Sequence, residues 1–339
     1  MKILICSHCF HPSVGGIETV SRILAEEFTK AGSEVTVITE TPGEEQYEYR
    51  IVRRPTRSTI RRLGREADIV FQSNISLNTL VPLLFTKKNI VIAHHTWLTR
   101  PNGRISWQDR LKRFVIRFCK NIAISKAIAA ALPVKSLLIG NPFEISEFSP
   151  YRQLPKTKDI VFVGRLVSDK GCDLAIEALA QLKAEGITPG FTIIGEGPER
   201  LALEAQVDKL GLSDQVTFLG SITVGRGKRI AEHKIILIPS RWEEPFGLVA
   251  LEGIASGCVP IASAKGGLGE AVNSCGILFP NGDISALASA IKLLLTDPIQ
   301  LEQYVSRADQ HLEQFRPDVV ARHYLDFFQH LIDGSQTKL

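Results

Sequence analysis

The sequence predicts an α/β protein made of two consecutive domains, each built on a doubly wound parallel sheet. Strand-like and helix-like segments alternate along the chain, and a stretch with three prolines and no clear period interrupts them between residues 141 and 157. Up to residue 150 the chain has 21 Lys and Arg against 13 Asp and Glu, and the remainder has 19 against 23. We therefore expect a basic domain over 1–150 and a mildly acidic domain over 156–315, with different partners.

The first domain is expected to open with a strand–helix–strand unit. The run KILIC at 2–6 is short, apolar and β-branched, which is typical of a buried parallel strand. Residues 18–30 place apolar side chains at helical spacing and end at Ala31-Gly32. Further strands are predicted at EVTVIT (34–39), ADIVFQS (67–73), NIVIAHH (89–95) and KNIAIS (120–125).

The second domain repeats the alternation, and a last helix is predicted over 318–333. The expected strands are DIVFVGR (159–165), FTIIGEGP (191–198), VTFLG (216–220), KIILIPS (234–240), VPIAS (259–263) and GILFP (276–280). The expected helices are CDLAIEALAQLKAEG (172–186), LALEAQVDKLG (201–211), LVALEGIASG (248–257) and SALASAIKLLLTD (285–297).

Composition argues against several classes of protein. No apolar run approaches the ~20 residues that a membrane-spanning helix needs, and the N-terminus lacks the apolar core of a signal peptide, so we expect a cytoplasmic protein. Six cysteines in 339 residues are too few for a disulfide scaffold. The basic first half carries no accompanying pattern of stacking aromatic residues, so a nucleic-acid partner is not expected.

The stretch ICSHCFHPSVGGIE near the N-terminus raises the question of a metal site, because it holds Cys6, His8, Cys9 and His11. A structural zinc usually draws its ligands from two separated pairs, and the sequence has no second pair. A redox Cys-x-x-Cys motif normally opens a helix, whereas a proline and two glycines follow here. We expect no metal and interpret the cysteines as residues packed at a strand end.

The double glycine that follows, Gly15-Gly16, lies between the first strand and the first helix. Glycine lets the backbone approach a ligand closely, and the N-terminus of a helix presents free N–H groups to anions. A plain turn between strand and helix explains the pair equally well, so both interpretations stay open on this stretch.

The second domain has cations where a parallel sheet binds ligands. Arg165 and Lys170 follow a strand directly and precede a helix, at the edge of a doubly wound sheet where the ligand crevice lies. They suit a diphosphate, with arginine as a bidentate fork and lysine as a point charge. Taken alone, they are better explained as two solvated residues of a surface loop.

The segment PSRWEEPFGLVALEGIASG adds carboxylates and helix amides. Glu244 lies on a turn beside proline, and a helix is expected to start at Phe246 with Gly247 and Leu248 in its first turn, where free amides bind anions. Glu252 then stands one to two turns into that helix and can accept hydrogen bonds from a diol such as a ribose. Alternatively, Glu244 is a negative charge near the N-terminus of the helix that the helix dipole stabilises, and Glu252 is an ordinary exposed helical residue.

A nicotinamide cofactor is not predicted. GEGPER follows a strand and contains Gly195 and Gly197, but Arg200 occupies the third glycine position of the dinucleotide fingerprint.

The segments HPSVGGIE, GRLVSDKG, IIGEGPER, PSRWEEPFGLVALEGIASG and AKGGLGEAV occur in this order. Their order and spacing resemble those of the nucleotide-sugar-dependent glycosyltransferases of family 4, from Lys2 to about Asp283. The resemblance implies the GT-B architecture, in which two Rossmann-like domains face a central cleft. It also implies that a C-terminal helix, at 318–335, packs back on the first domain.

The resemblance implies a donor site for a nucleoside diphosphate sugar in the second domain. Arg165 and Lys170 match the cations on the diphosphate, and Glu252 matches the carboxylate on the ribose hydroxyls. The donor-binding set that it implies consists of Gly16, Arg165, Lys170, Gly195, Gly247, Leu248 and Glu252.

Two residues match the catalytic positions of the family. Glu244 matches the carboxylate that touches hydroxyls of the donor sugar, and His95 matches the histidine that lines the cleft beside it. The choice of His95 over its neighbour His94 rests on register alone. The chain has Asn141-Pro142 where the family often has Asn-Gly, which concerns the acceptor side.

The activity implied by the resemblance is a retaining, metal-independent transfer of a sugar from a UDP-, GDP- or ADP-sugar to a hydroxyl acceptor. The pathway implied is the synthesis of cell-surface polysaccharide, lipopolysaccharide or glycolipid, and no further cofactor is needed. A GT-B nucleotide-sugar epimerase or a non-catalytic nucleotide-sugar-binding protein would share the donor site, and both remain alternatives.

Residues 105–120, ISWQDRLKRFVIRFCK, predict a basic amphipathic helix. Its apolar stripe comprises Ile105, Trp107, Leu111, Phe114, Val115 and Phe118. Such a helix can lie on anionic lipid, which would place the protein at the inner face of a membrane with a lipid-linked acceptor. An ordinary core-facing helix with a solvated basic flank is the alternative.

Overall fold

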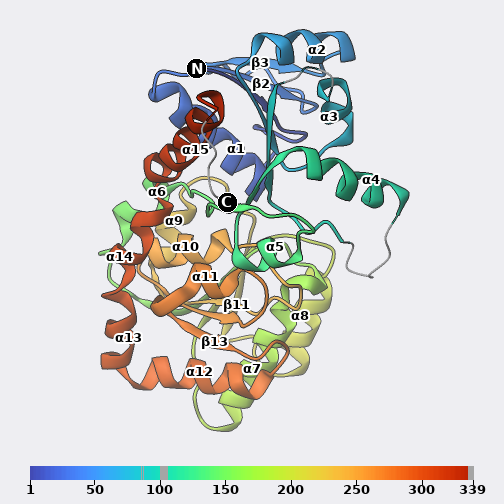
Figure 1. Ribbon diagram of the computed structural model, residues 1–339. Coiled ribbons are helices and arrows are strands. Elements are labelled where there is room, and N and C mark those ends of the chain that lie inside the picture. Colours follow the sequence, from blue (N-terminus) through green and yellow to red (C-terminus); the bar gives the residue numbers. More distant parts are fainter. Residues whose placement is uncertain (85, 87, 100–105, 335–339) are drawn as a thin grey trace. The chain divides into compact units, whose positions relative to one another are not determined.

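The computed structural model describes residues 1–84, 86, 88–99 and 106–334. The chain forms two compact units (Figure 1): Met1–Phe143 with Gln314–Leu339, and Glu144–Glu313. Each unit contains one parallel sheet with helices packed around it. The prediction of an α/β protein with two doubly wound sheets is confirmed.

The sheet of the first unit has seven strands in the order β3-β2-β1-β4-β5-β6-β7. Its inner strands β1, β4 and β5 are buried almost throughout, which explains why they read as continuous apolar runs. The strands are β1 (Lys2–Cys6), β2 (Glu34–Thr39), β3 (Arg50–Arg53), β4 (Ile69–Ser73), β5 (Asn89–His94), β6 (Lys120–Ala123) and β7 (Leu137–Leu138).

The last helix of the chain returns to the first unit. The rings of Tyr324 and Phe328 on α15 contact Phe28 of α1 and Phe71 of β4, with centroids 5.3–6.1 Å apart. These four aromatic side chains are fully buried, so they fasten a segment that is distant in sequence. The helices of this unit are α1 (Gly16–Lys30), α2 (Arg57–Glu66), α3 (Leu77–Leu83), α4 (Trp107–Val115), η1 (Ile116–Phe118), α5 (Lys126–Ala131) and α15 (Pro317–Ile332).

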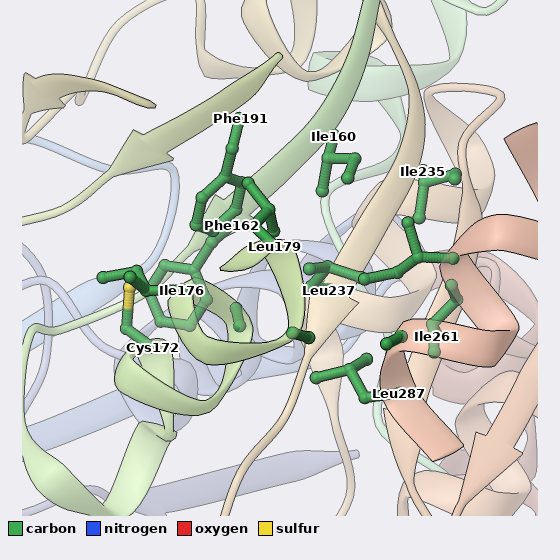
Figure 2. Close-up of a cluster of buried hydrophobic side chains, with 14 of the residues drawn as sticks. Ile160, Phe162, Cys172, Ile176, Leu179, Phe191, Ile235, Leu237, Ile261 and Leu287 are labelled. Carbon is green, nitrogen blue, oxygen red and sulfur yellow. The ribbon is translucent and has the colours of Figure 1, made fainter. Parts of the chain in front are cut away.

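The sheet of the second unit has six strands in the order β10-β9-β8-β11-β12-β13. Ile160 and Phe162 of β8, Ile235 and Leu237 of β11 and Leu179 of α7 belong to one buried cluster (Figure 2). The strands are β8 (Lys158–Val163), β9 (Phe191–Ile194), β10 (Val216–Gly220), β11 (His233–Ile238), β12 (Val259–Ser263) and β13 (Ile277–Phe279).

Helices on both faces of this sheet complete the second unit. They are α6 (Ile145–Phe148), α7 (Cys172–Ala184), α8 (Arg200–Lys209), α9 (Arg226–Ala231), α10 (Leu248–Ala255), α11 (Leu268–Val272), α12 (Ile284–Thr296), α13 (Pro298–Val305) and α14 (Ala308–Leu312). Short 3₁₀ turns are η2 (Ser149–Tyr151), η3 (Ser168–Lys170) and η4 (Asn273–Cys275), and η5 (Glu313–Phe315) spans the boundary at which the chain returns to the first unit.

The structure differs from the predicted elements at several points. The stretch 141–157, expected to be an irregular linker, contains α6 and η2, and Phe148 of α6 is fully buried. Strands β3 and β7 and helix α2 were not predicted, because β3 and α2 are rich in arginine and β7 has two residues. Helix α1 begins at Gly16, two residues before the predicted start.

In the part of the chain that the structure describes, no single helix is long and apolar enough to cross a membrane. One broken pair, Ile284–Thr296 and Pro298–Ile332, reaches the required length and composition only when its members are taken together.

Candidate active site

The order of the second sheet reverses at β8. The chain passes from β8 to β9 on one side of this strand, and β11 pairs with its other side. The loops after β8 and β11 therefore diverge at the carboxyl edge of the sheet, which is where doubly wound sheets bind ligands. Arg165 and Lys170 follow β8, and Glu244 follows β11.

Lys170 and Glu244 are in direct contact. The Lys170 Nζ lies 2.5 Å from the Glu244 Oε1, and the Ser240 hydroxyl donates to the same oxygen at 2.9 Å. The two charged side chains are 33% and 17% exposed, so the pair is only partly screened by water. The sequence analysis did not identify Ser240. The feature that could have indicated it is a hydroxyl side chain four positions before Glu244, at the end of a predicted strand.

Backbone contacts hold these two loops together independently of that ion pair. The N–H groups of Arg241 and Trp242 donate to the Asp169 carbonyl at 2.9 and 3.2 Å. The Arg241 guanidinium also forms two hydrogen bonds to the Asp173 carboxylate, each of 2.5 Å. Lys170 and Glu244 are thus presented by a fixed framework, which is what a preorganised site requires.

Arg165 lies on the same edge and is exposed. Its side chain makes no hydrogen bond or ion pair with any residue that the structure describes. Its charge is therefore available to an anion bound from solvent, and it is joined neither to Lys170 nor to Glu252.

Helix α10 begins at Leu248, two residues later than predicted, with Gly247 as its N-cap. Gly247 has φ 118°, and a Cβ on it would meet the Leu268 Cδ2 at 2.6 Å, so another residue would be strained and would clash. No side chain in the described ranges caps this end of the helix. The first amides of α10 therefore remain as donors at the positive end of the helix dipole.

Glu252, in the middle of α10, is buried with 9% of its surface exposed, so its interpretation as an exposed helical residue is wrong. Its Oε1 accepts a hydrogen bond from the Arg226 Nη2 at 3.0 Å. Its Oε2 is buried and has no partner among the described residues. Burial raises the pKa of this carboxyl, and the Arg226 charge acts in the opposite direction.

Gly195 has a packing explanation. Its N–H donates to the Gly220 carbonyl at 2.8 Å, and a Cβ on it would lie 1.8 Å from the Gly164 carbonyl oxygen. The glycine thus lets the loops after β8 and β9 touch, while its amide is already engaged.

Gly16 and His95 lie in the first unit. Gly16 is the exposed first residue of α1, and no side chain in the described ranges caps this helix. The free amides of this end are consistent with either interpretation of the double glycine.

The two adjacent histidines differ in their surroundings. The Asn121 amide nitrogen donates to the Ile116 and Cys119 carbonyls, both at 2.9 Å, so its Oδ1 must be an acceptor. The His94 Nε2, 2.8 Å from that oxygen, therefore carries the proton. His94 is held by this bond, although its Nδ1 has no partner within the described ranges.

His95 is 4% exposed, and neither of its ring nitrogens has a hydrogen bond of normal geometry to a described residue. Burial, and to a smaller extent His94, lower its pKa to about 4, while the neighbouring Asn141 side chain acts in the opposite direction. His95 is therefore neutral at pH 7, with both ring nitrogens available.

Among the described residues, no group of three or more His, Cys, Asp and Glu side chains is arranged to hold a metal ion. Burial raises the pKa of the Cys6 thiol, so this cysteine stays protonated. A pocket of about 310 Å³ lies at the opposite, amino edge of the first sheet, beside Lys2, Glu34 and Arg50. Its position separates it from the strand ends that carry the candidate residues.

Two units of this kind, with candidate residues at the carboxyl ends of parallel strands, define the GT-B class of protein. A solved structure of Anabaena HepE in complex with UDP and glucose has the same fold, with a TM-score of 0.80 and 22% identity. The match covers 97% of this chain and 99% of HepE.

Residues 145–311 match the family model "Glycosyl transferases group 1". The second unit is therefore similar to the glycosyl transferases of group 1, which agrees with the glycosyltransferase resemblance of the sequence motifs. The chain is 34% identical over 180 residues to the exopolysaccharide phosphotransferase SCO2592 of Streptomyces coelicolor, covering 52% of this chain and 19% of that protein. It is 32% identical over 180 residues to a glycogen synthase of Mycobacterium tuberculosis, covering 52% and 43%. The chain thus spans less than half the length of either relative.

Proposed function

We propose that this protein is a retaining glycosyltransferase that moves a sugar from a nucleoside diphosphate sugar to a hydroxyl acceptor. The observation that carries the proposal is the carboxyl edge of the second sheet, where Lys170 and Glu244 meet on loops that follow β8 and β11. The match of residues 145–311 to a glycosyltransferase family model supports it, and so does the buried Glu252 of α10, one of whose carboxylate oxygens has no partner among the described residues.

The donor nucleotide is bound in this proposal by the second unit, which the sequence predicted as a domain over 156–315. Arg165, Lys170 and the first amides of α10, at Gly247 and Leu248, hold the diphosphate. The free Oε2 of Glu252 accepts hydrogen bonds from the ribose hydroxyls. Gly195 supports these loops through packing.

The sugar is placed by Glu244, with its Oε1 already oriented by Lys170 and Ser240. The family resemblance further assigns neutral His95 to a hydroxyl of the donor sugar and Gly16 to the donor-binding set, and both roles are part of the proposal. The first unit holds the acceptor; the sequence predicted this domain over 1–150 with a helix at 318–335, and position 335 lies outside the described residues.

The bond from the anomeric carbon to the diphosphate oxygen breaks, and its electron pair leaves with the diphosphate. The acceptor oxygen forms the new bond on the same face of the sugar, and its proton passes to the departing phosphate. Cations and helix amides aimed at the diphosphate stabilise the charge that develops there. UDP is the favoured nucleotide, because HepE, which has the same fold, was solved with UDP and glucose.

A thermal-shift screen of UDP-, GDP- and ADP-sugars tests the proposal. A donor at 100 times its Kd is expected to raise the Tm by roughly 5–10 °C, because it binds only the folded state. Glu252→Ala is expected to reduce this shift and to lower turnover in parallel. The proposal fails if no nucleotide sugar shifts the Tm.

Product analysis separates the proposal from its alternatives. Incubation of the nucleotide sugar alone is expected to leave its stereochemistry unchanged, and addition of an acceptor is expected to give a glycoside of retained configuration. An epimerised nucleotide sugar would identify an epimerase. Tight binding without transfer to any acceptor would identify a binding protein.

We further propose that the acceptor is lipid-linked and that the first unit contacts an anionic membrane through α4. The apolar residues Trp107, Leu111, Phe114 and Phe118 follow each other at helical spacing and are 70%, 36%, 54% and 73% exposed. Val115, the remaining described member of the predicted stripe, is buried in the core of the first unit, so α4 packs inward through that side chain. The other four, including Phe118 of η1, face solvent, which favours an interfacial role for that part of the stripe. Ile105, also part of the predicted stripe, lies outside the described residues.

The charges around this stripe suit anionic lipid. Arg110, Arg117 and Lys120 are exposed beside it, while the acid of this segment, Asp109, is buried in the capping box with Ser106. Aromatic side chains flanked by basic residues are typical of helices that lie in a membrane interface.

Flotation with vesicles tests the contact. The protein is expected to float with phosphatidylglycerol-containing vesicles at low salt and less at high salt, and to remain behind with neutral vesicles. A triple variant with serine at 107, 114 and 118 is expected to lose flotation. Serine at Leu201 and Ile299, which are also exposed, is the matched control and should float normally. Equal flotation of all three proteins would refute the contact.

A further inference from the structure

Arg226 is a charged residue that neither the motifs nor the fold class pointed to, yet it touches the most buried acid of the candidate site. Its Nη2 donates to the Glu252 Oε1 at 3.0 Å, and its guanidinium lies over the Phe148 ring, 5.3 Å from the centroid. The Glu147 carboxylate is 3.8 Å from the same nitrogen. The guanidinium is thus fixed between α6 and α10.

Two glycines allow α9 to deliver this side chain. Gly225 caps the helix in the left-handed region, with φ 72°. A Cβ on Gly227 would lie 2.0 Å from the Glu147 carbonyl oxygen, so only glycine lets α9 pack directly on the backbone of α6. The contact between Arg226 and Glu252 is therefore built into the backbone path.

We infer that Arg226 is a positioning residue for donor binding, which holds the Glu252 carboxylate ionised through Oε1 and leaves Oε2 to accept the hydroxyls of the ligand's ribose. The inference rests on the proposed function and deepens it. A buried carboxylate with no cation beside it would take up a proton and lose the charge that strengthens its hydrogen bonds.

The pH dependence follows from the groups around Glu252. Arg226 of α9 and Glu147 of α6 exert the main charge effects, and they oppose each other. The other elements packed against α10 carry Glu270 (α11), His233 and Lys234 (β11), and Asp309 and His311 (α14). When the Arg226 charge is removed, burial and Glu147 remain, and both raise the pKa of Glu252. The carboxyl of such a variant should ionise only at higher pH, so the variant should bind the nucleotide better as the pH rises.

The test measures the affinity of UDP, GDP and ADP, which share the ribose and the diphosphate, between pH 6 and pH 8.5. For whichever nucleotide binds the wild type, Arg226→Gln is expected to weaken binding about 10- to 100-fold at pH 6, the cost of a charge-assisted hydrogen bond, with partial recovery at pH 8.5. Arg226→Lys keeps the charge, so it should show the wild-type pH profile and lose less nucleotide affinity than Arg226→Gln. Arg229→Gln is the matched control on the same helix, because Arg229 pairs with Glu232 and is 55% exposed.

The outcomes separate this inference from the proposed function. If the wild type binds no nucleotide, the proposed function fails. Suppose that the wild type binds a nucleotide. If Arg226→Gln binds that nucleotide equally well, or with an affinity that is reduced by the same factor at every pH, the positioning role is refuted while the proposed function stands. Should Arg226→Gln fold poorly, the pH profile of Arg226→Lys decides in its place: a strong pH dependence there would overturn the inference.

Discussion

Replacing His95 with leucine is expected to stabilise the ligand-free protein while removing most of its transfer activity. Both ring nitrogens of His95 are buried, and neither has a hydrogen bond of normal geometry to a described residue, although the Asn141 side chain lies nearby. An unsatisfied buried polar group costs about 1–3 kcal/mol. Leucine fills a similar volume with no polar atoms. We expect the free energy of unfolding at pH 7 to rise by about 1–2 kcal/mol.

The same variant should be less sensitive to acid. The pKa of His95 is lowered from 6.5 to about 4 in the folded state, so the unfolded chain binds more protons between these values. Stability is therefore lost as the pH falls from 6.5 towards 4, by about 2 kcal/mol between pH 7 and pH 5. This loss should be absent in His95→Leu.

His233 provides a matched contrast. Burial lowers its pKa to about 4 as well, but its Nδ1 lies 2.9 Å from the Arg229 carbonyl and its Nε2 2.8 Å from the Thr192 hydroxyl. His233→Leu should flatten the pH dependence equally, yet cost about 1–3 kcal/mol at pH 7, because it strands those partners.

The assay is urea unfolding at pH 7 and pH 5, followed by tryptophan fluorescence. Trp97 and Trp107 report on the first unit, which holds His95, and Trp242 on the second, which holds His233. Transfer activity is measured on the same preparations. A destabilised His95→Leu at pH 7, or an unchanged difference between pH 7 and pH 5, would refute the reasoning.

Two further predictions concern single contacts. The first is a double-mutant cycle with Lys170→Met and Glu244→Gln, measured by the free energy of unfolding of the second unit. We expect a coupling free energy of about 1 kcal/mol for this partly exposed pair. Zero coupling would show that the pair does not form in solution. The second concerns Tyr324, whose buried hydroxyl has no partner among the described residues, so Tyr324→Phe should leave the free energy of unfolding unchanged or raise it. Tyr324→Ala should lower it by about 3–5 kcal/mol. A large loss of stability in the phenylalanine variant would contradict the contact geometry.

Much of the fold could be predicted because strands buried on both faces must be continuous apolar runs. KILIC and KIILIPS show this pattern, and β1 and β11 follow it closely. The positions of Lys170 and Glu244 could also be predicted, because the carboxyl ends of parallel strands share one edge. Their ion pair is the direct consequence.

Other features could not be predicted because they depend on contacts between distant segments. Arg226 and Glu252 are 26 positions apart and meet only because Gly227 lets α9 press on α6. The burial of Phe148 converts an irregular, proline-containing stretch into part of that contact. Periodicity predicted an amphipathic α4, but it could not say that Val115 of the apolar stripe would be buried while Trp107 and Phe114 would face solvent.

By itself the sequence determined the two alternating α/β units, the strand ends that carry charged residues, and the ordered motifs of the family. These are local properties, set by hydrophobic spacing and by the backbone needs of glycine and proline. Tertiary structure decided which buried polar atoms have no partner of normal geometry among the described residues, including the Glu252 Oε2 and both nitrogens of His95. Burial and hydrogen bonding are sums over neighbours from the whole unit, and no stretch of sequence contains them.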